Sequence, residues 1–181
     1  MLLLTALLAG CATLSREQCR QGDWFGIGEA DGRAGEQTSR LQQHAQACAE
    51  YGTGVDERQY LAGRDQGLRE YCRLDNAFAT GLQGRRHQRV CPPEIDAVFD
   101  HYHRAAYEVY LIKRTLDAVE NQSADVERRL HARDLSDGSR SQLRFDLREL
   151  ERRRDQLRAD LYAGERYLDD LMDEAHTRNT P

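Results

Sequence analysis

The stretch EIDAVFDHYHRAAYEVYLIKRTLDAVENQSADVERRL, residues 94–130, decides the fold of this chain. Steps of alternating three and four residues from Ile95 to Leu130 reach an apolar or aromatic residue every time except at Ser123. Such a heptad series is typical of a helix that pairs with another helix. A helix of this length would rise about 50 Å, at about 1.5 Å per residue. The sequence therefore predicts a long coiled-coil helix here.

A second heptad series of the same kind runs from Leu143 to Ala175. If the chain folds back so that paired residue numbers add up to 273, each position of one series meets a position of the other. Val109, for example, meets Gly164, one of the few residues of the second series that is not a large aliphatic. A short connection between two such helices makes them antiparallel neighbours. We therefore predict an antiparallel coiled-coil hairpin over residues 93–177.

The residues between the two series suit a turn. The segment 134–139, Asp-Leu-Ser-Asp-Gly-Ser, is rich in side chains that satisfy loose backbone groups. Ser139 followed by Gln142 fits a capping box, which predicts the start of the second helix at this point. The alternative is one continuous helix in a parallel oligomer. Gly138 disfavours it, because glycine is costly inside a helix.

Composition narrows the class of protein. The chain has 181 residues, 31% of them charged, and a net charge of -5. That polarity is high for one large globular core but ordinary for a charged rod. The negative net charge disfavours a general nucleic-acid binder. The run Arg152-Arg153-Arg154 lies among acidic residues and is interpreted as a solvated helix face.

The first residues resemble an export signal. Residues 1–10 are Leu-rich and uncharged, and Leu-Ala-Gly-Cys at 8–11 resembles the lipobox of bacterial lipoproteins. The resemblance implies a signal peptide over 1–10 that is cleaved before Cys11, attachment of diacylglycerol with acyl chains such as palmitate at Cys11, and a tether over 11–18. The apolar run is too short to span a bilayer. The alternative is a buried apolar strand.

Two details refine this interpretation. No Lys or Arg precedes the apolar run, so we expect the natural translation start to lie upstream. Residue 12 is Ala rather than Asp. By resemblance to enterobacterial-type sorting, Ala12 implies an outer-membrane location facing the periplasm. A mature lipoprotein carries more than one acyl chain, which stable anchoring requires.

Four further cysteines follow, namely Cys19, Cys48, Cys72 and Cys91. An even number in an exported chain predicts two disulfides in one of three connectivities. We favour Cys19–Cys48 and Cys72–Cys91, which join neighbours along the chain. No pair has the Cys-x-x-Cys spacing of a zinc or redox motif. The segment 19–92 has few large aliphatic residues, and a small module of this kind needs such staples.

Glycines in this module are patterned. Phe25, Tyr60 and Phe78 each precede a glycine by three residues, and a second glycine follows three or four residues later. On a helix this spacing puts the glycines on one face and lets two backbones approach closely. We predict helices near 23–50, 56–72 and 75–86 whose glycine faces pack together. The alternative is that some of these glycines form turns.

These motifs together carry a family resemblance. Asp23-Trp24, Gly28-x-x-Asp31-Gly32-x-x-Gly35, His44 and Cys48 are followed by further motifs in order. They are Tyr60-x-x-Gly63-Arg64-x-x-Gly67-Leu68-x-x-Tyr71-Cys72, Gly81-x-x-Gly84 and Val90-Cys91-Pro92. About residues 19–92 resemble a family of proteobacterial lipoproteins known as domain of unknown function 2799. The resemblance implies an envelope lipoprotein, and it brings no activity, cofactor or catalytic residue.

Four residues within the motifs are candidates for a small-ligand or cell-wall-glycan site, namely Trp24, Asp31, His44 and Arg64. Nothing in the sequence places them within hydrogen-bond reach of one another. The alternative is that they are helix caps, salt links and core residues. His101 and His103 are two residues apart, whereas helical metal pairs need a spacing of four. We predict no metal site, no cofactor and no catalytic residue.

The sequence thus predicts an all-α protein, a small disulfide-stapled helical module followed by a long antiparallel two-helix coiled-coil hairpin. The first functional hypothesis is a non-catalytic lipoprotein of the bacterial cell envelope, anchored in the membrane through Cys11. A protein partner or a second copy of the chain would bind the hairpin. The alternative is a ligand-binding module, with its site at the four candidate residues. An enzyme acting on envelope polymers is disfavoured, because no catalytic constellation is legible.

Overall fold

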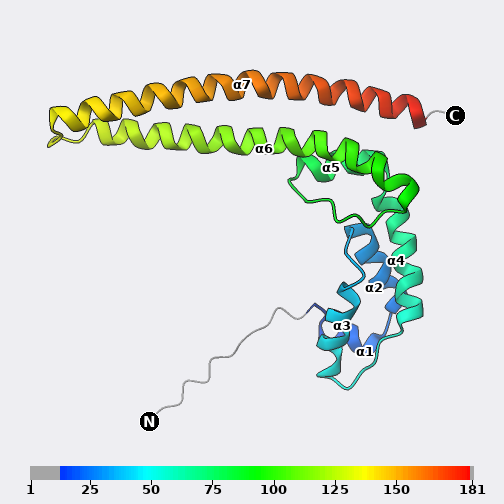
Figure 1. Ribbon diagram of the computed structural model, residues 1–181. Coiled ribbons are helices and arrows are strands. Elements are labelled where there is room, and N and C mark those ends of the chain that lie inside the picture. Colours follow the sequence, from blue (N-terminus) through cyan, green and yellow to red (C-terminus); the bar gives the residue numbers. More distant parts are fainter. Residues whose placement is uncertain (1–12, 180–181) are drawn as a thin grey trace, which may run out of the picture. The chain divides into compact units, whose positions relative to one another are not determined.

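The computed structural model describes residues 13–179, and within them every regular element is a helix (Figure 1). The helices are α1 (Arg16–Gln21), α2 (Trp24–Ala34), α3 (Arg40–Ala49), α4 (Glu57–Tyr71), α5 (Leu74–Leu82), α6 (Pro93–Leu130) and α7 (Asp137–Asn179). The predicted fold class is confirmed. The chain is divided into two compact units. The described part of the first unit consists of residues 13–73 and 88–96. The second contains residues 74–87 and those from 97 onward.

The first unit begins with a capped helix where a tether is predicted. Leu14 is buried, and Ser15 forms a capping box with Gln18 at the start of α1. Gly22 ends the helix in the left-handed conformation. Within the stretch 11–18, Leu14 therefore packs in the core and residues 16–18 already belong to α1. Burial of the apolar Leu14 side chain and capping of α1 by Ser15 both stabilise this folded segment.

Helices α2 and α4 run in the same direction, and their backbones are in contact. A Cβ added at Gly28 would lie 2.8 Å from the carbonyl carbon of Tyr60, and one added at Gly32 would lie 2.9 Å from the nitrogen of Leu68. Because both partners advance along α4 as the glycines advance along α2, the two helices run in the same direction. Gly63 and Gly67 meet α2 in the same way. The predicted close packing of these glycine faces is thus confirmed.

The predicted helix over 23–50 is wrong, because it is divided in two. Gly35 has a φ of 71° and ends α2, and its backbone N–H bonds to the carbonyls of Asp31 and Gly32. Helix α3 starts only at Arg40. Glycine adopts this left-handed conformation without the steric cost that other residues meet, so it commonly ends a helix.

Both disulfides join the pairs that the sequence favours. Cys19–Cys48 ties α1 to α3, and Cys72–Cys91 ties the end of α4 to the segment before α6. Three of the four cysteines are 6% exposed or less, and Cys91 is 8% exposed. Cross-links of this kind restrict the unfolded chain and stabilise a domain by about 2–4 kcal/mol each.

In the second unit, α6 and α7 lie side by side in opposite directions (Figure 1). A Cβ added at Gly164 would lie 3.4 Å from Val109 Cγ2, as the predicted register requires. Lys113 Nζ lies 2.7 Å from Glu165, and Arg158 lies 2.9 Å from Glu120, one heptad further along. Opposite charges along one edge of the seam fix the register, and exposed pairs of this type add little stability.

The turn of the hairpin differs in detail from the prediction. Helix α6 ends at Leu130, and α7 already begins at Asp137. The hydroxyl of Ser136 accepts a hydrogen bond from the backbone N–H of Ser139 at 3.2 Å. Ser136 therefore occupies the capping position that the sequence assigned to Ser139. Both serines fit a start signal, so composition alone could not choose between them.

Helix α5 packs against α6 rather than against the other glycine helices. A Cβ at Gly81 would lie 2.7 Å from the Cβ of Ala106 and 3.0 Å from the nitrogen of Tyr107. Gly84 has a φ of 72° and faces the ring of Tyr110. The prediction that all three glycine faces pack together is therefore wrong for the third. Instead, Gly81 faces the backbone of α6.

Candidate functional site

Asp31, on α2, is the centre of a buried polar network. One carboxylate oxygen, Oδ2, lies 2.8 Å from Nε2 of His44 on α3. The same oxygen accepts a hydrogen bond of 2.7 Å from the hydroxyl of Tyr60 on α4. Three helices thus meet at one carboxylate, and two of the predicted site residues, Asp31 and His44, are brought together.

The other ring nitrogen of His44 continues the network. Its Nδ1 lies 2.8 Å from Oγ1 of Thr13, just before α1. With Nε2 donating to Asp31, a neutral imidazole has Nδ1 free to accept the proton of the Thr13 hydroxyl. Buried polar groups are costly unless they are hydrogen-bonded, and both ring nitrogens of His44 are. This series of hydrogen bonds, from the hydroxyl through the imidazole to the carboxylate, therefore holds the segment at Thr13 against the core.

Electrostatics reinforce the ionised form of Asp31. Burial by itself would raise the pKa of this carboxyl, but hydrogen bonds from His44 and Tyr60 and the charge of Arg40 outweigh it. The net pKa of Asp31 lies below its ordinary value. Burial, together with the hydrogen bond to Asp31 and its charge, raises the pKa of the Tyr60 phenol. Tyr60 is therefore a permanent donor.

The order hydroxyl, imidazole and carboxylate is also that of a nucleophilic triad. A triad needs a reactive atom that a substrate can reach. Here His44 is 2% exposed and Tyr60 is 0% exposed. Asp31 uses the oxygen that binds His44 to bind Tyr60 as well. Thr13, whose hydroxyl would be the nucleophile, is half-buried, and the network joins three helices through hydrogen bonds.

The remaining predicted site residues lie apart from this network. Trp24 is 4% exposed and belongs to a core cluster with Leu14, Tyr60 and the Cys19–Cys48 disulfide. Its ring is thus covered by the protein. Arg64 Nε and Nη2 lie 3.1 and 2.7 Å from the backbone oxygen of Glu36. The ligand-binding role of the four residues stays a prediction, and their geometry does not converge on one cleft.

Two members of the network are not among the residues that the sequence singled out for a site. Tyr60 stands in a quoted motif, but no role was assigned to its hydroxyl. Thr13 carried no signal, because it lies in the stretch predicted to be a tether. Among the described residues no group of three or more His, Cys, Asp or Glu side chains could hold a metal ion. Cys11 lies outside the described residues.

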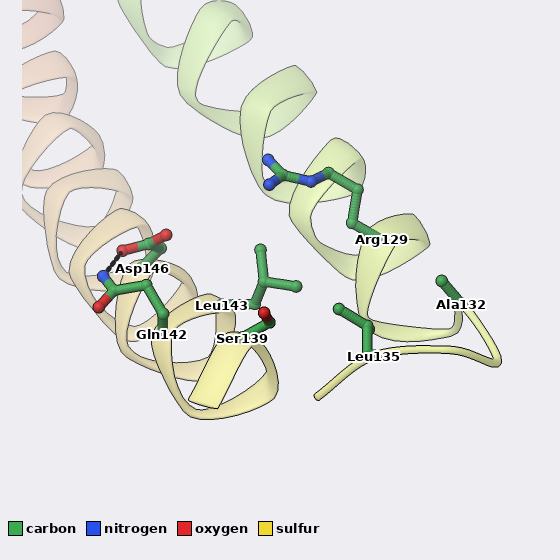
Figure 2. A pocket seen from close by; sticks show the side chains of 7 residues that line it. All are labelled: Arg129, Ala132, Leu135, Ser139, Gln142, Leu143 and Asp146. Carbon is green, nitrogen blue, oxygen red and sulfur yellow. Dashed lines mark hydrogen bonds between the residues drawn. The ribbon is translucent and has the colours of Figure 1, made fainter. Parts of the chain in front are cut away.

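A shallow hollow of about 420 Å³ lies at the turn of the hairpin (Figure 2). Ala132, Leu135 and Leu143 are its apolar lining. Its charged side chains already have partners: Asp146 accepts a hydrogen bond of 2.7 Å from Gln142, and Arg129 lies 4.0 Å from Asp125. With few apolar side chains and with its charges compensated, this hollow offers little to a specific ligand.

The described residues form an all-helical protein with two disulfides and a buried polar network. The model of the family "Protein of unknown function (DUF2799)" matches residues 23–108. The segment that is similar to this family extends beyond the module into α6. No curated protein and no solved structure matches the chain. Between residues 13 and 179, none of the helices has both the length and the apolar character needed to cross a membrane.

Proposed function

We propose that this protein is a lipid-anchored component of the bacterial cell envelope with a non-catalytic, structural or protein-binding role. One observation carries the proposal. Thr13 and Leu14 are fixed in the core, and they follow the cysteine of the Leu-Ala-Gly-Cys motif by only two and three residues. Two residues of chain reach about 7 Å at most. An acyl chain on Cys11 would therefore hold the first unit directly at the membrane surface.

Side chains near this point suit a membrane surface. The guanidinium of Arg16 lies 5.9 Å from the ring centre of Tyr51, and both residues are exposed. Tyrosine and arginine are both at home at the boundary between lipid and water, where an apolar body and a polar tip are satisfied together. The disulfides support an oxidising compartment such as the periplasm. We place the protein at the outer membrane, facing the periplasm.

The hairpin supplies the surface for a partner. A two-helix hairpin buries only a narrow stripe of each helix. Large apolar side chains remain exposed on it, among them Leu111, Phe145, Tyr162 and Tyr167. We propose that a partner protein or a second copy of the chain binds along these sides. Crosslinking in intact cells, followed by identification of the captured proteins, distinguishes these two occupants.

The anchor is tested by labelling cells with an alkyne analogue of palmitate. The full-length protein should take up the label and float with membranes in a density gradient. Its Cys11→Ser variant should lose the label and remain in the soluble fraction. Thr13→Ser keeps the hydroxyl and should behave as the unchanged protein. Equal labelling of the unchanged protein and of Cys11→Ser would overturn the proposal.

A further inference from the structure

Arg64 carries a buried positive charge that has no carboxylate to balance it. Its residue is 6% exposed, and its only hydrogen-bond acceptor within residues 13–179 is the backbone oxygen of Glu36. Arg33, by contrast, is exposed and binds the carboxylates of Glu29 and Glu70. Buried charges are ordinarily paired, since removing a charge from water is expensive. A carbonyl dipole compensates a guanidinium only in part.

The carboxylate of the buried network, that of Asp31, already has other partners. Asp31 binds His44 and Tyr60 through the same oxygen. The charge of Arg40 also acts on Asp31, and the Nε of Arg40 is buried without a hydrogen-bond partner in the described part of the chain. Asp31 is therefore not the partner of Arg64. The other arginine of this region, Arg89, is exposed and lies 3.9 Å from Asp96.

A groove of about 390 Å³ opens beside Arg64, within the first unit. Its lining contains two arginines, two hydroxyls and two amides but no acid, and consists of Gln37, Thr38, Ser39, Arg64, Gln88, Arg89 and Val90. A hydrogen bond of 3.3 Å from Gln37 to Gln88 joins its two walls. Nearly every polar side chain that faces this groove can donate a hydrogen bond.

The start of α3 adds to this surface. Ser39 stands at the capping position but makes no side-chain capping bond. Within the described residues, neither its hydroxyl nor that of Thr38 has a hydrogen-bond partner. The backbone amides of residues 40–42 already donate to the carbonyls of residues 37–39, so the start of α3 offers its two hydroxyls to this surface. The uncompensated arginine is a separate observation that points to the same place.

We propose that this groove binds a phosphate group, either as inorganic phosphate or as the headgroup of a phospholipid. A carboxylate would best use the forked edge of a guanidinium, but Nε and Nη2 of Arg64 are already taken by Glu36. The free Nη1, the two hydroxyls and the second arginine are single donors spread around the groove. A tetrahedral phosphate, with several acceptor oxygens, matches such a set. The proposal does not depend on acylation of Cys11.

The test is a titration of the full chain, with both disulfides formed, followed by ¹H–¹⁵N NMR. Inorganic phosphate is added at constant ionic strength against a sodium chloride control. We expect saturable shifts of the amides of residues 37–40 and of the Arg64 Nε signal. Dihexanoyl phosphatidylglycerol, kept below its critical micelle concentration, is titrated separately. Tighter binding of this lipid than of phosphate identifies a headgroup as the natural source, and the reverse order identifies free phosphate.

Three variants and one control make the result specific. Arg64→Gln should weaken binding by about tenfold or more, as loss of a charged hydrogen bond does. Because Arg64 is buried, Arg89→Gln and Ser39→Ala serve as variants at exposed positions, each expected to weaken binding about threefold. Arg69→Gln removes the same charge from an exposed site on α4 outside the groove and should leave binding unchanged.

Two results would overturn the proposal. The first is the absence of a saturable shift at these residues up to about 10 mM of either ligand, a range that covers weak specific binding. The second is equal binding by the unchanged protein, Arg89→Gln and Ser39→Ala. If these residues donate hydrogen bonds to the phosphate, their removal must lower the affinity.

Discussion

Gly63 of α4 lies directly against the backbone of Phe25 on α2, so that an added Cβ would overlap the carbonyl oxygen of Phe25 and lie 2.8 Å from its carbonyl carbon. The backbone nitrogen of Glu29, one turn further along α2, would be 3.0 Å away. Because backbone atoms rather than flexible side chains surround the glycine, the neighbours cannot move aside. The separation of the two helices is fixed by the absence of a side chain.

Gly63→Ala is therefore expected to destabilise the first unit severely. Alanine favours a helix by about 1 kcal/mol over glycine, but the overlap with α2 should cost about 3 kcal/mol or more. Urea denaturation of the oxidised protein, followed by circular dichroism, measures the net change. Gly54→Ala is the matched control, because nothing lies within 4 Å of a Cβ at Gly54. A Gly63→Ala protein as stable as this control would contradict the close packing.

The opposite result is expected for Gly164, in the seam of the hairpin. A Cβ there would lie 3.4 Å from Cγ2 of Val109 and 3.8 Å from Cδ1 of Ile112, which are ordinary contact distances. Gly164→Ala should stabilise the hairpin by about 0.5–1 kcal/mol, because alanine loses less backbone entropy on forming a helix. The same urea titration measures it. A loss of stability would mean that the seam is tighter here than the register implies.

The outcome at these glycines shows how far the sequence could predict the fold. The heptad pattern determined the register of the hairpin, since one fold-back pairs every seam position, and Val109 and Gly164 do meet. Spacing also predicted the contact between the glycine faces of α2 and α4. The spacing could not predict that Gly81 faces α6. A row of glycines on one helix face indicates that another backbone packs closely there, but it does not identify the helix that supplies that backbone.

The buried network was less predictable. Asp31 and His44 were singled out as polar residues within motifs, but their distance depends on how three helices cross. Thr13 could not be recognised, because one hydroxyl before a helix has no periodicity and its partner, His44, is far along the chain. Arg64 was selected for its charge. Its burial and its bond to a backbone oxygen are consequences of tertiary packing, and composition and spacing do not encode them.

The link between Thr13 and His44 gives the next prediction. Thr13→Val keeps the shape of the side chain and removes the hydroxyl, which leaves Nδ1 of His44 buried without a partner. An unsatisfied buried group of this kind costs about 1–3 kcal/mol. Limited proteolysis should then cut more readily near residue 13, and the free energy of unfolding should fall by that amount. Thr177→Val, at an exposed position, is the control. Unchanged proteolysis would contradict the fastening role of the network.

Stability in acid is expected to depend on His103 in the second unit. This histidine is 4% exposed, and its Nε2 donates a hydrogen bond of 2.7 Å to the backbone oxygen of Arg85. Burial lowers its pKa, and nearby His87 acts in the same direction, against the opposing effects of the bond to Arg85 and of Asp100. The folded protein therefore binds this proton less readily than the unfolded chain. The resulting stability is complete above about pH 6.5, the ordinary value for histidine, and is lost as the pH falls through the lower folded pKa.

Urea denaturation between pH 7.5 and pH 5 tests this dependence. The unchanged protein should lose free energy of unfolding as the pH falls, and His103→Gln should lose less, because glutamine can donate to Arg85 but does not titrate. His101→Gln, an exposed neighbour on the same helix, should follow the unchanged protein. Asp31 does not interfere in this window, because its lowered pKa makes its own contribution disappear only below about pH 4. Parallel pH profiles for the unchanged protein and His103→Gln would show that the buried imidazole does not control the acid limit of the fold.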